Sequence, residues 1–263
     1  MSHSSIILLR FKGLIGALFL LLTHASAQTI VNTETLLLDG EVPFHWTAGA
    51  SGDFSVGNSD VVDLTLDGGC AWTSGKWRLK ASAAWAKLAQ DGEDIQSNAF
   101  GQLRILWGEP SILQPFLFVQ SSQNNVFLMS QRNLWGGGVK RRLIKGSTLF
   151  VDASLGAFAE HEFYVDEALE PPQNMVRNSI ILSLGANLTE EVLFRMTTFV
   201  QTSYEDFRDS RVFLECALDA TITDKVSLEW SSGLRWDSQP HGDLGTWDLG
   251  NTLGLRFGLN QEE

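Results

Sequence analysis

The stretch "SGDFSVGNSDVVDLTLDGG", residues 51–69, consists of two alternating segments joined by a small polar turn at residues 57–59. Gly, Asn and Ser, which form this turn, are residue types that favour tight turns. Around it, acids alternate with apolar side chains: the acids are Asp53, Asp63 and Asp67, and the apolar side chains are Phe54, Val62, Leu64 and Leu66. Because successive side chains of a strand point to opposite faces, the pattern predicts a β-hairpin with one acidic and one apolar face.

The same period-two alternation recurs along the chain and gives twelve expected strands. They are residues 44–55, 62–73, 77–85, 95–107, 113–122, 132–143, 148–160, 176–188, 193–204, 211–222, 226–237 and 246–257. Most of these segments exceed the roughly 5 or 6 residues of strands in soluble sheets and suit the roughly 9–11 residues of a tilted strand that crosses a bilayer. The alternation therefore favours membrane-spanning strands.

The connections between these strands differ by position. After even-numbered strands they are short, and after odd-numbered strands they are longer and more acidic. The short connections are residues 74–76, 108–111, 144–147, 189–192 and 223–225, and the longer ones include residues 89–94, 161–175 and 238–245. An even strand number, with short turns at one end and long loops at the other, is typical of outer-membrane barrels. Both chain ends then lie on the periplasmic side.

Aromatic residues on the apolar faces gather near the strand ends. Near the short turns lie Trp46, Trp72, Trp77, Trp107 and Phe257, and near the long loops lie Phe54, Trp85, Tyr204, Trp236 and Trp247. Two such levels match the aromatic girdles that membrane barrels place at the lipid–water interfaces. The sequence thus predicts an all-β fold, a 12-stranded antiparallel transmembrane β-barrel of the outer-membrane type, with a polar interior.

The N-terminal segment has the pattern of a secretory signal peptide. Arg10 and Lys12 precede an apolar run at residues 14–22, and small residues end at Ala27. We expect cleavage near Ala27 and export to the bacterial outer membrane. The expected organisation is a signal peptide (1–27), a short periplasmic segment (28–43), the barrel (44–259) and a C-terminal tail (260–263). The net charge of −12 argues against a nucleic-acid partner.

Three stretches resemble the DUF481 family of salt-induced outer-membrane proteins. They are the opening hairpin with its Gly-Asn-Ser turn, "QRNLWGGGVKRRL" at residues 131–143 and "VSLEWSSGLRWDS" at residues 226–238. The resemblance implies an outer-membrane barrel whose molecular activity is not established. In the last strand, Thr252, Gly254, Phe257 and Leu259 resemble the signal recognised by the barrel-assembly machinery, which we expect as a partner during biogenesis together with outer-membrane lipid and lipopolysaccharide.

Charged side chains are expected to face the lumen on most strands. The bases are Arg78, Lys80, Arg104, Lys140, Arg142 and Arg235, and the acids are Asp53, Asp63, Asp67, Asp152, Glu215, Asp219, Glu229 and Asp237. We expect the bases of the third, fourth and sixth strands to be the partners of the acids. One hypothesis is a transverse field that selects small polar solutes. The alternative is that the charges pair and plug the barrel, because an unpaired buried charge is costly.

Further acids are expected at the external end of the barrel. They are Asp91, Glu93, Asp94, Glu160, Glu162, Asp166, Glu167, Glu170, Glu205, Asp206, Asp209 and Asp243. Carboxylates of this kind either form a solvated loop surface or bind Ca²⁺ or Mg²⁺ shared with lipopolysaccharide phosphates.

The expected function is a passive one, as an envelope component or a narrow pore for small polar solutes. An outer-membrane enzyme of the phospholipase type and a secreted soluble calyx are the alternatives. Catalysis would require a histidine beside an outward serine, whereas His45 is expected inside the barrel and His161 and His241 in external loops. We therefore predict no catalytic residue, no cofactor and no metal site.

Overall fold

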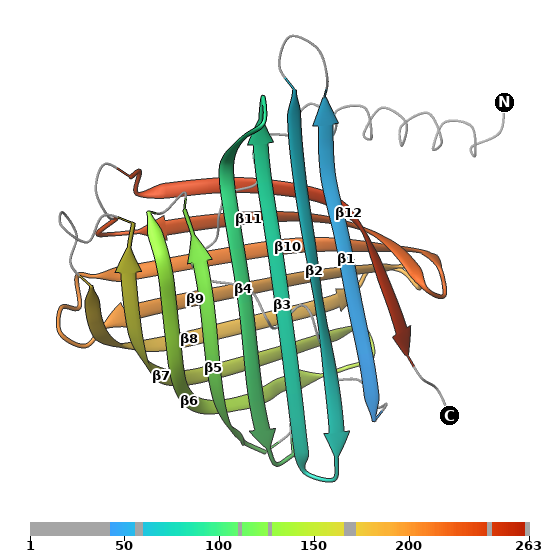
Figure 1. The fold of residues 1–263 in the computed structure, drawn as a ribbon. Coiled ribbons are helices and arrows are strands. Elements are labelled where there is room, and N and C mark those ends of the chain that lie inside the picture. Colours follow the sequence, from blue (N-terminus) through green and yellow to red (C-terminus); the bar gives the residue numbers. More distant parts are fainter. Residues whose placement is uncertain are drawn as a thin grey trace, which may run out of the picture.

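The computed structural model describes residues 43–55, 60–109, 112–125, 128–165, 172–240 and 244–260. Within these ranges, twelve strands form one closed barrel in which each strand pairs antiparallel with its neighbours in sequence (Figure 1). β1 closes the ring against β12, with Trp46 opposite Leu259 and Ser51 opposite Gly254. The predicted fold class is confirmed. No helix in the described part of the chain is long and apolar enough to span a membrane.

Most strand boundaries lie within a few residues of those expected from the sequence. The strands are β1 (Phe44–Ser55), β2 (Val61–Ser74), β3 (Trp77–Gln90), β4 (Glu93–Trp107), β5 (Gln114–Asn124), β6 (Met129–Lys145), β7 (Leu149–Tyr164), β8 (Gln173–Asn187), β9 (Val192–Ser203), β10 (Ser210–Thr223), β11 (Val226–Asp237) and β12 (Trp247–Asn260). The largest difference in the site region is at β7, which continues four residues beyond the expected end at residue 160. Residue 162 therefore belongs to the barrel wall.

The two ends of the barrel differ in their connections. We call the end that carries the β2–β3, β6–β7, β8–β9 and β10–β11 links the turn end, and the opposite one the loop end. The prediction of a long loop at residues 89–94 is wrong, because β3 and β4 are joined at the loop end by Asp91 and Gly92 alone. Both have positive φ, 52° and 84°, as a two-residue type I′ hairpin requires, and Asp-Gly favours this turn.

Several sequence predictions fall outside the described residues. Residues 1–42, which include the expected signal peptide and most of the periplasmic segment, are not described, and neither is the turn at residues 57–59. The side chains of Asp53, Phe54 and Leu259 are likewise outside the description. The division into leader, segment, barrel and tail therefore stays a prediction.

The barrel is apolar outside and polar inside. On β5, Leu117 and Val119 are 69% and 53% exposed, whereas Gln114 and Gln120, on the other face, are buried. The same inversion holds around the ring, where most buried side chains are polar or charged and many large apolar side chains are exposed. A soluble calyx would show the opposite arrangement, with an apolar interior.

The aromatic residues of the predicted girdles occupy the ends of the strands. Exposed side chains at the turn end are Trp72, Trp77, Trp107 and Phe257, with Trp46 half-buried, and those at the loop end are Trp85, Tyr204, Trp236 and Trp247. Trp77 lies opposite Trp107, and Trp236 opposite Trp247. Their role as anchors at the lipid interface stays a prediction.

Glycines on β6 make room for aromatic side chains inside the barrel. A Cβ added at Gly136 would lie 2.5 Å from the Cβ of Phe158, and one at Gly138 would lie 2.9 Å from Cζ of Phe116. Phe118 packs between the two rings, with centroids 6.4 Å from Phe116 and 6.2 Å from Phe158. The Gly-rich motif of β6 therefore allows the interior over β5–β9, which we call the filled side, to be packed with rings.

Candidate functional site: the barrel lumen

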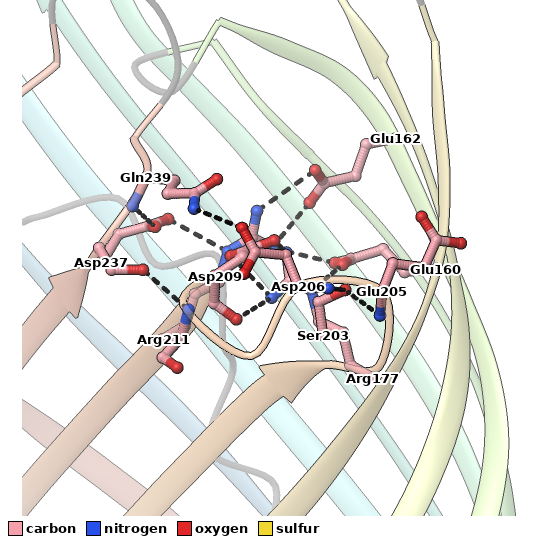
Figure 2. Close-up of polar contacts among 12 residues, drawn as sticks. Glu160, Glu162, Arg177, Ser203, Glu205, Asp206, Asp209, Arg211, Asp237 and Gln239 are labelled. Carbon is pink, nitrogen blue, oxygen red and sulfur yellow. Dashed lines mark hydrogen bonds and ion pairs between the residues drawn. The ribbon is translucent and has the colours of Figure 1, made fainter.

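An ion-pair network lies inside the barrel at its loop end (Figure 2). We call it the loop-end network; its members are Arg132, Glu160, Glu162, Arg177, Asp209, Arg211, Arg235, Asp237 and Asp248. At its centre, Glu160 binds three arginines: Arg177 Nε lies 2.5 Å from Oε2, Arg211 Nη1 lies 3.1 Å from Oε1, and Arg132 also contacts Oε1. These four side chains are almost completely buried.

The network links the barrel wall to the β9–β10 connection. Arg177 on β8 donates to both carboxylate oxygens of Asp209, at 3.0 and 2.5 Å, and Asp209 directly precedes β10. Arg211 reaches Glu162 on β7 at 3.0 Å and Asp237 on β11 at 3.1 Å. Arg177, Arg211 and Glu160 thus each have at least two opposite charges as partners, which is what keeps buried ions tolerable.

The local sequence places these groups together by strand alternation. Glu160 and Glu162 are two residues apart, so both point inward, and Arg132 lies directly opposite Glu162 on β6. Arg211 and Asp237 are likewise cross-strand partners. Tyr164, two residues further along β7, donates its hydroxyl to Glu162 Oε2 at 2.8 Å.

The sequence interpretation of three acids is therefore wrong. Glu160, Glu162 and Asp209 were expected among solvated or cation-binding acids of the external loops, but they are 2%, 1% and 9% exposed. Their carboxylates bind arginines on the inside of the barrel. The reason is the extra length of β7 and the contact of the Asp209 side chain with Arg177.

A second network lies in the turn-end half of the lumen, on β2 and β9–β12. We call it the turn-end network; its members are Asp67, Arg195, Asp219, Glu229 and Arg256. Arg256 Nη2 lies 2.7 Å from Glu229 Oε1, and Arg256 Nη1 lies 3.2 Å from Asp67 Oδ2. Arg195 Nε lies 2.6 Å from Asp219 Oδ2 and the same guanidinium also contacts Glu229.

For the turn-end network, the prediction of which bases bind the lumen acids is wrong. Asp67, Asp219 and Glu229 bind Arg256 and Arg195, not the bases of the third, fourth and sixth strands. Both arginines could have been found by alternation, because Arg256 shares a face with Gly254 and Arg195 shares one with Thr197. Asp67 also depends on a glycine, since a Cβ at Gly49 would lie 2.5 Å from its Oδ1.

The bases predicted on β3, β4 and β6 lie inside the wall of the filled side or next to it. Lys140 Nζ and Arg142 Nε lie 3.3 and 2.7 Å from the Asp152 carboxylate on β7. Arg104, opposite Lys80 in the β3–β4 pair, places its guanidinium 5.0 Å from the ring centroid of Phe116. On β6, the structure thus brings Lys140 and Arg142 together with the predicted acid Asp152.

The remaining predicted charges occupy separate places. Arg235 on β11 binds Asp237 at 3.0 Å and Asp248 at 2.9 Å. Glu215 on β10 lines a cavity described below. Asp63 on β2 is half-buried and lies opposite Leu88. Arg78 lies opposite Thr73 and Leu106 on the neighbouring strands.

One of the three histidines considered above, His161, lies elsewhere than predicted from the sequence. His161 is part of β7, opposite Asn133, and its ring lies 5.1 Å from Phe163 and 6.2 Å from Trp135. It is therefore an aromatic contact on the wall and not a loop residue. His45 is buried, as expected for an inward position, and His241 lies outside the described residues.

A cavity of about 220 Å³ occupies the interior over β1–β4 and β10–β12, which we call the open side, and reaches Ser122 and Gln123 near the loop end of β5. Small residues form much of its wall, including Gly49, Ala86, Ser231, Gly233, Gly250 and Thr252. By contrast, a cavity among the aromatic rings of the filled side measures about 40 Å³. Arg256 and its carboxylate partners border the open-side cavity. The volume suffices for about seven water molecules, at the roughly 30 Å³ that each occupies in the liquid.

Residues 48–258 match the family described as "Protein of unknown function, DUF481". The chain belongs to this family. The match covers the barrel from β1 to β12 and confirms the resemblance seen in the three sequence stretches. No curated protein matches the chain.

Solved structures of outer-membrane barrels resemble this family member in fold. The translocator domain of the autotransporter NalP from Neisseria meningitidis has a TM-score of 0.48 at 12% identity, over 86% of this chain and 90% of that one. The NanC porin has a TM-score of 0.46 at 8% identity, over 81% and 97%. The KdgM porin in complex with oligogalacturonate has a TM-score of 0.43 at 7% identity, over 82% and 96%.

Proposed function

We propose that this protein resides in the bacterial outer membrane and allows small polar solutes to pass along the open side of its lumen. The observation that carries the proposal is the open-side cavity of about 220 Å³ beside a tightly packed filled side. Twelve strands lie between the filled eight-stranded barrels and the water-filled sixteen-stranded porins. A narrow, one-sided conduit fits that intermediate size.

The exterior supports a position in lipid. Large apolar side chains such as Leu103, Leu117, Leu155 and Ile180 are more than half exposed. A soluble protein rarely exposes a contiguous apolar surface of more than a few hundred Å². The pattern of a secretory leader in residues 1–27 agrees with export, and lipopolysaccharide and the barrel-assembly machinery are the partners that this location would supply.

The turn-end network would set the narrowest part of the conduit. Arg256 joins Asp67 on β2 to Glu229 on β11, and thereby bridges the inner face of the wall across the β1–β12 closure. Removing its guanidinium would widen the path there. A solute that passes this point has to share it with a bound arginine, which restricts passage to small molecules.

Single-channel conductance in planar bilayers tests the proposal. We expect discrete currents from the folded protein and a larger unitary conductance for Arg256→Ala. Arg208→Ala is the matched control, because Arg208 is exposed in the β9–β10 connection, and its conductance should equal that of the unchanged protein. Folding is checked by heat-modifiable migration on SDS gels. Folded protein that carries no current would overturn the proposal.

The second candidate is a closed barrel with a purely structural role in the envelope. It is favoured by the loop-end network, in which Glu160 and Arg177 are almost fully buried among further charges. The same experiment separates the two, because a closed barrel gives no current with any variant. A secreted calyx would be recovered in the salt-washed soluble fraction instead of the membrane.

A further inference from the structure

The open-side cavity has more carboxylates than bases in its wall. Four acids line it, Asp67, Glu215, Glu229 and Asp248, and two arginines, Arg235 and Arg256. Both arginines are already bound to carboxylates: Arg235 Nη1 lies 2.9 Å from Asp248 Oδ2, and Arg256 Nη2 lies 2.7 Å from Glu229 Oε1. The wall therefore carries an excess of negative charge.

Hydrogen-bond acceptors without a partner also face this cavity. The Ser122 side chain on β5 is 7% exposed, and its Oγ makes no hydrogen bond within the described part of the chain. The Asn98 Oδ1 on β4 is likewise buried and unbonded among the described residues. A buried polar atom without a partner is costly, so these atoms are acceptors suited to a donor group that enters the cavity.

We propose that the open-side cavity binds and selects small organic cations that carry N–H donors, such as primary ammonium ions. The inference rests on the proposed pore and names the class of solute that it admits. An ammonium group is a cation with three donors and no acceptor. It matches a wall that has more carboxylates than bases and that carries the unbonded Ser122 Oγ and Asn98 Oδ1, whereas an anion would meet repulsion there. Rings of acidic side chains select cations in other pores by the same physics.

The first measurement is the reversal potential of the conducting protein in a KCl gradient. We expect the sign that corresponds to preferred passage of K⁺ over Cl⁻. Glu215→Gln should lower the K⁺/Cl⁻ permeability ratio by about tenfold, because one unit charge about 6 Å away in water-like surroundings changes the K⁺ and Cl⁻ permeabilities by about threefold each, in opposite directions. Glu190→Gln is the matched control: it removes one acidic charge from the exposed β8–β9 turn, outside the lumen, and should leave the ratio unchanged.

The second measurement uses putrescine, a diammonium ion, as the probe. Added to one side, it should reduce the K⁺ current of the unchanged protein. Ser122→Ala should weaken this block and leave the K⁺/Cl⁻ ratio intact, because the substitution removes an acceptor and no charge. Glu215→Gln should both weaken the block by putrescine and lower the K⁺/Cl⁻ permeability ratio.

The outcomes separate this inference from the proposed function. A current that is unselective or prefers Cl⁻ would overturn the cation site while leaving the pore in place. A cation-selective current that putrescine does not reduce would overturn the ammonium class. Folded protein without any current would overturn the pore itself, and the cation site with it.

Discussion

The filled and open sides of the lumen are built from the same alternating strands but differ in the size of their inward side chains. On the filled side, Phe116, Phe158 and Phe199 are buried, and the arginines and glutamates of the loop-end network close the space above them. On the open side the corresponding positions include Gly233 and Gly250, and a cavity remains. Alternation decides that a side chain points inward, whereas its volume decides whether the lumen is closed there.

The largest expected effect concerns the centre of the loop-end network. Glu160→Gln removes the carboxylate that Arg132, Arg177 and Arg211 share. Removing one partner from a buried ion pair costs about 3–5 kcal/mol, because the remaining charges stay buried. We expect a loss of this size in the free energy of unfolding, measured by urea unfolding in lipid vesicles with tryptophan fluorescence.

Glu215→Gln on the open side is the control for that loss. Glu215 borders the cavity and is only half-buried, so the same chemical change should cost no more than about 1 kcal/mol. Equal losses for the two variants would contradict the division of the lumen into a filled and an open side.

The next effect sharpens the comparison with one bulky substitution on each side. Ser179→Trp places an indole where the available space is about 40 Å³, and Ser231→Trp places one in the 220 Å³ cavity. We expect the first to destabilise the barrel by about 1–3 kcal/mol through overpacking. The second should leave the stability nearly unchanged and lower the unitary conductance. Stability is measured by urea unfolding and conductance in planar bilayers. If Ser231→Trp destabilised the barrel and Ser179→Trp lowered the conductance, the assignment of the conduit to the open side would be wrong.

A smaller steric effect is expected at the glycines of β6. Gly136→Ala brings a Cβ to within 2.5 Å of the Phe158 Cβ and 2.6 Å of its Cα, so the backbone must shift. Gly101→Ala is the control, since a Cβ there meets nothing within 4 Å. We expect a loss of about 1–2 kcal/mol for the first in urea unfolding and almost none for the second. A tolerated alanine at Gly136 would argue that the filled side is not tightly packed.

Much of the fold could be predicted from the sequence because strand direction is a local property. Period-two alternation in β11 fixes the strand at residues 226–237, and it places Glu229 and Arg235 on the inner face. Turn chemistry is local as well, and Asp91-Gly92 could have been assigned to a two-residue hairpin on its residue types alone.

The charge pairs could not be predicted to the same extent, because they depend on how far each strand extends and which strands meet across the lumen. The end of β7 at Tyr164 decides that Glu162 is buried, and the residue directly after it, Val165, is not a turn-forming type. The contact between Asp67 and Arg256 joins residues 189 positions apart and forms only because the barrel closes between β1 and β12. The position of the open-side cavity could not be predicted either, because it depends on which strands bring their small inward residues together across the lumen.

The smallest expected effect lies in the connection that covers the filled side, at Asp206. This exposed carboxylate accepts a hydrogen bond from the Arg208 backbone N–H at 2.9 Å and another from Gln239 Nε2 at 3.3 Å. The Arg208 bond first, and the Gln239 bond second, lower the pKa of Asp206 below its ordinary value. Both bonds favour the charged form, so the stabilisation is present above the unfolded pKa of about 3.9 and is lost as the pH falls through the lower folded pKa.

An NMR titration of the folded protein in detergent micelles measures this effect through the Arg208 amide shift. We expect a midpoint below about 3.9 for the unchanged protein and no corresponding titration in Asp206→Asn, which keeps an acceptor oxygen but cannot ionise. Gln239→Ala should move the midpoint back toward the ordinary value, because only the Arg208 bond remains. A midpoint at or above 3.9 in the unchanged protein would mean that the β9–β10 connection is not held in this conformation over the loop-end network.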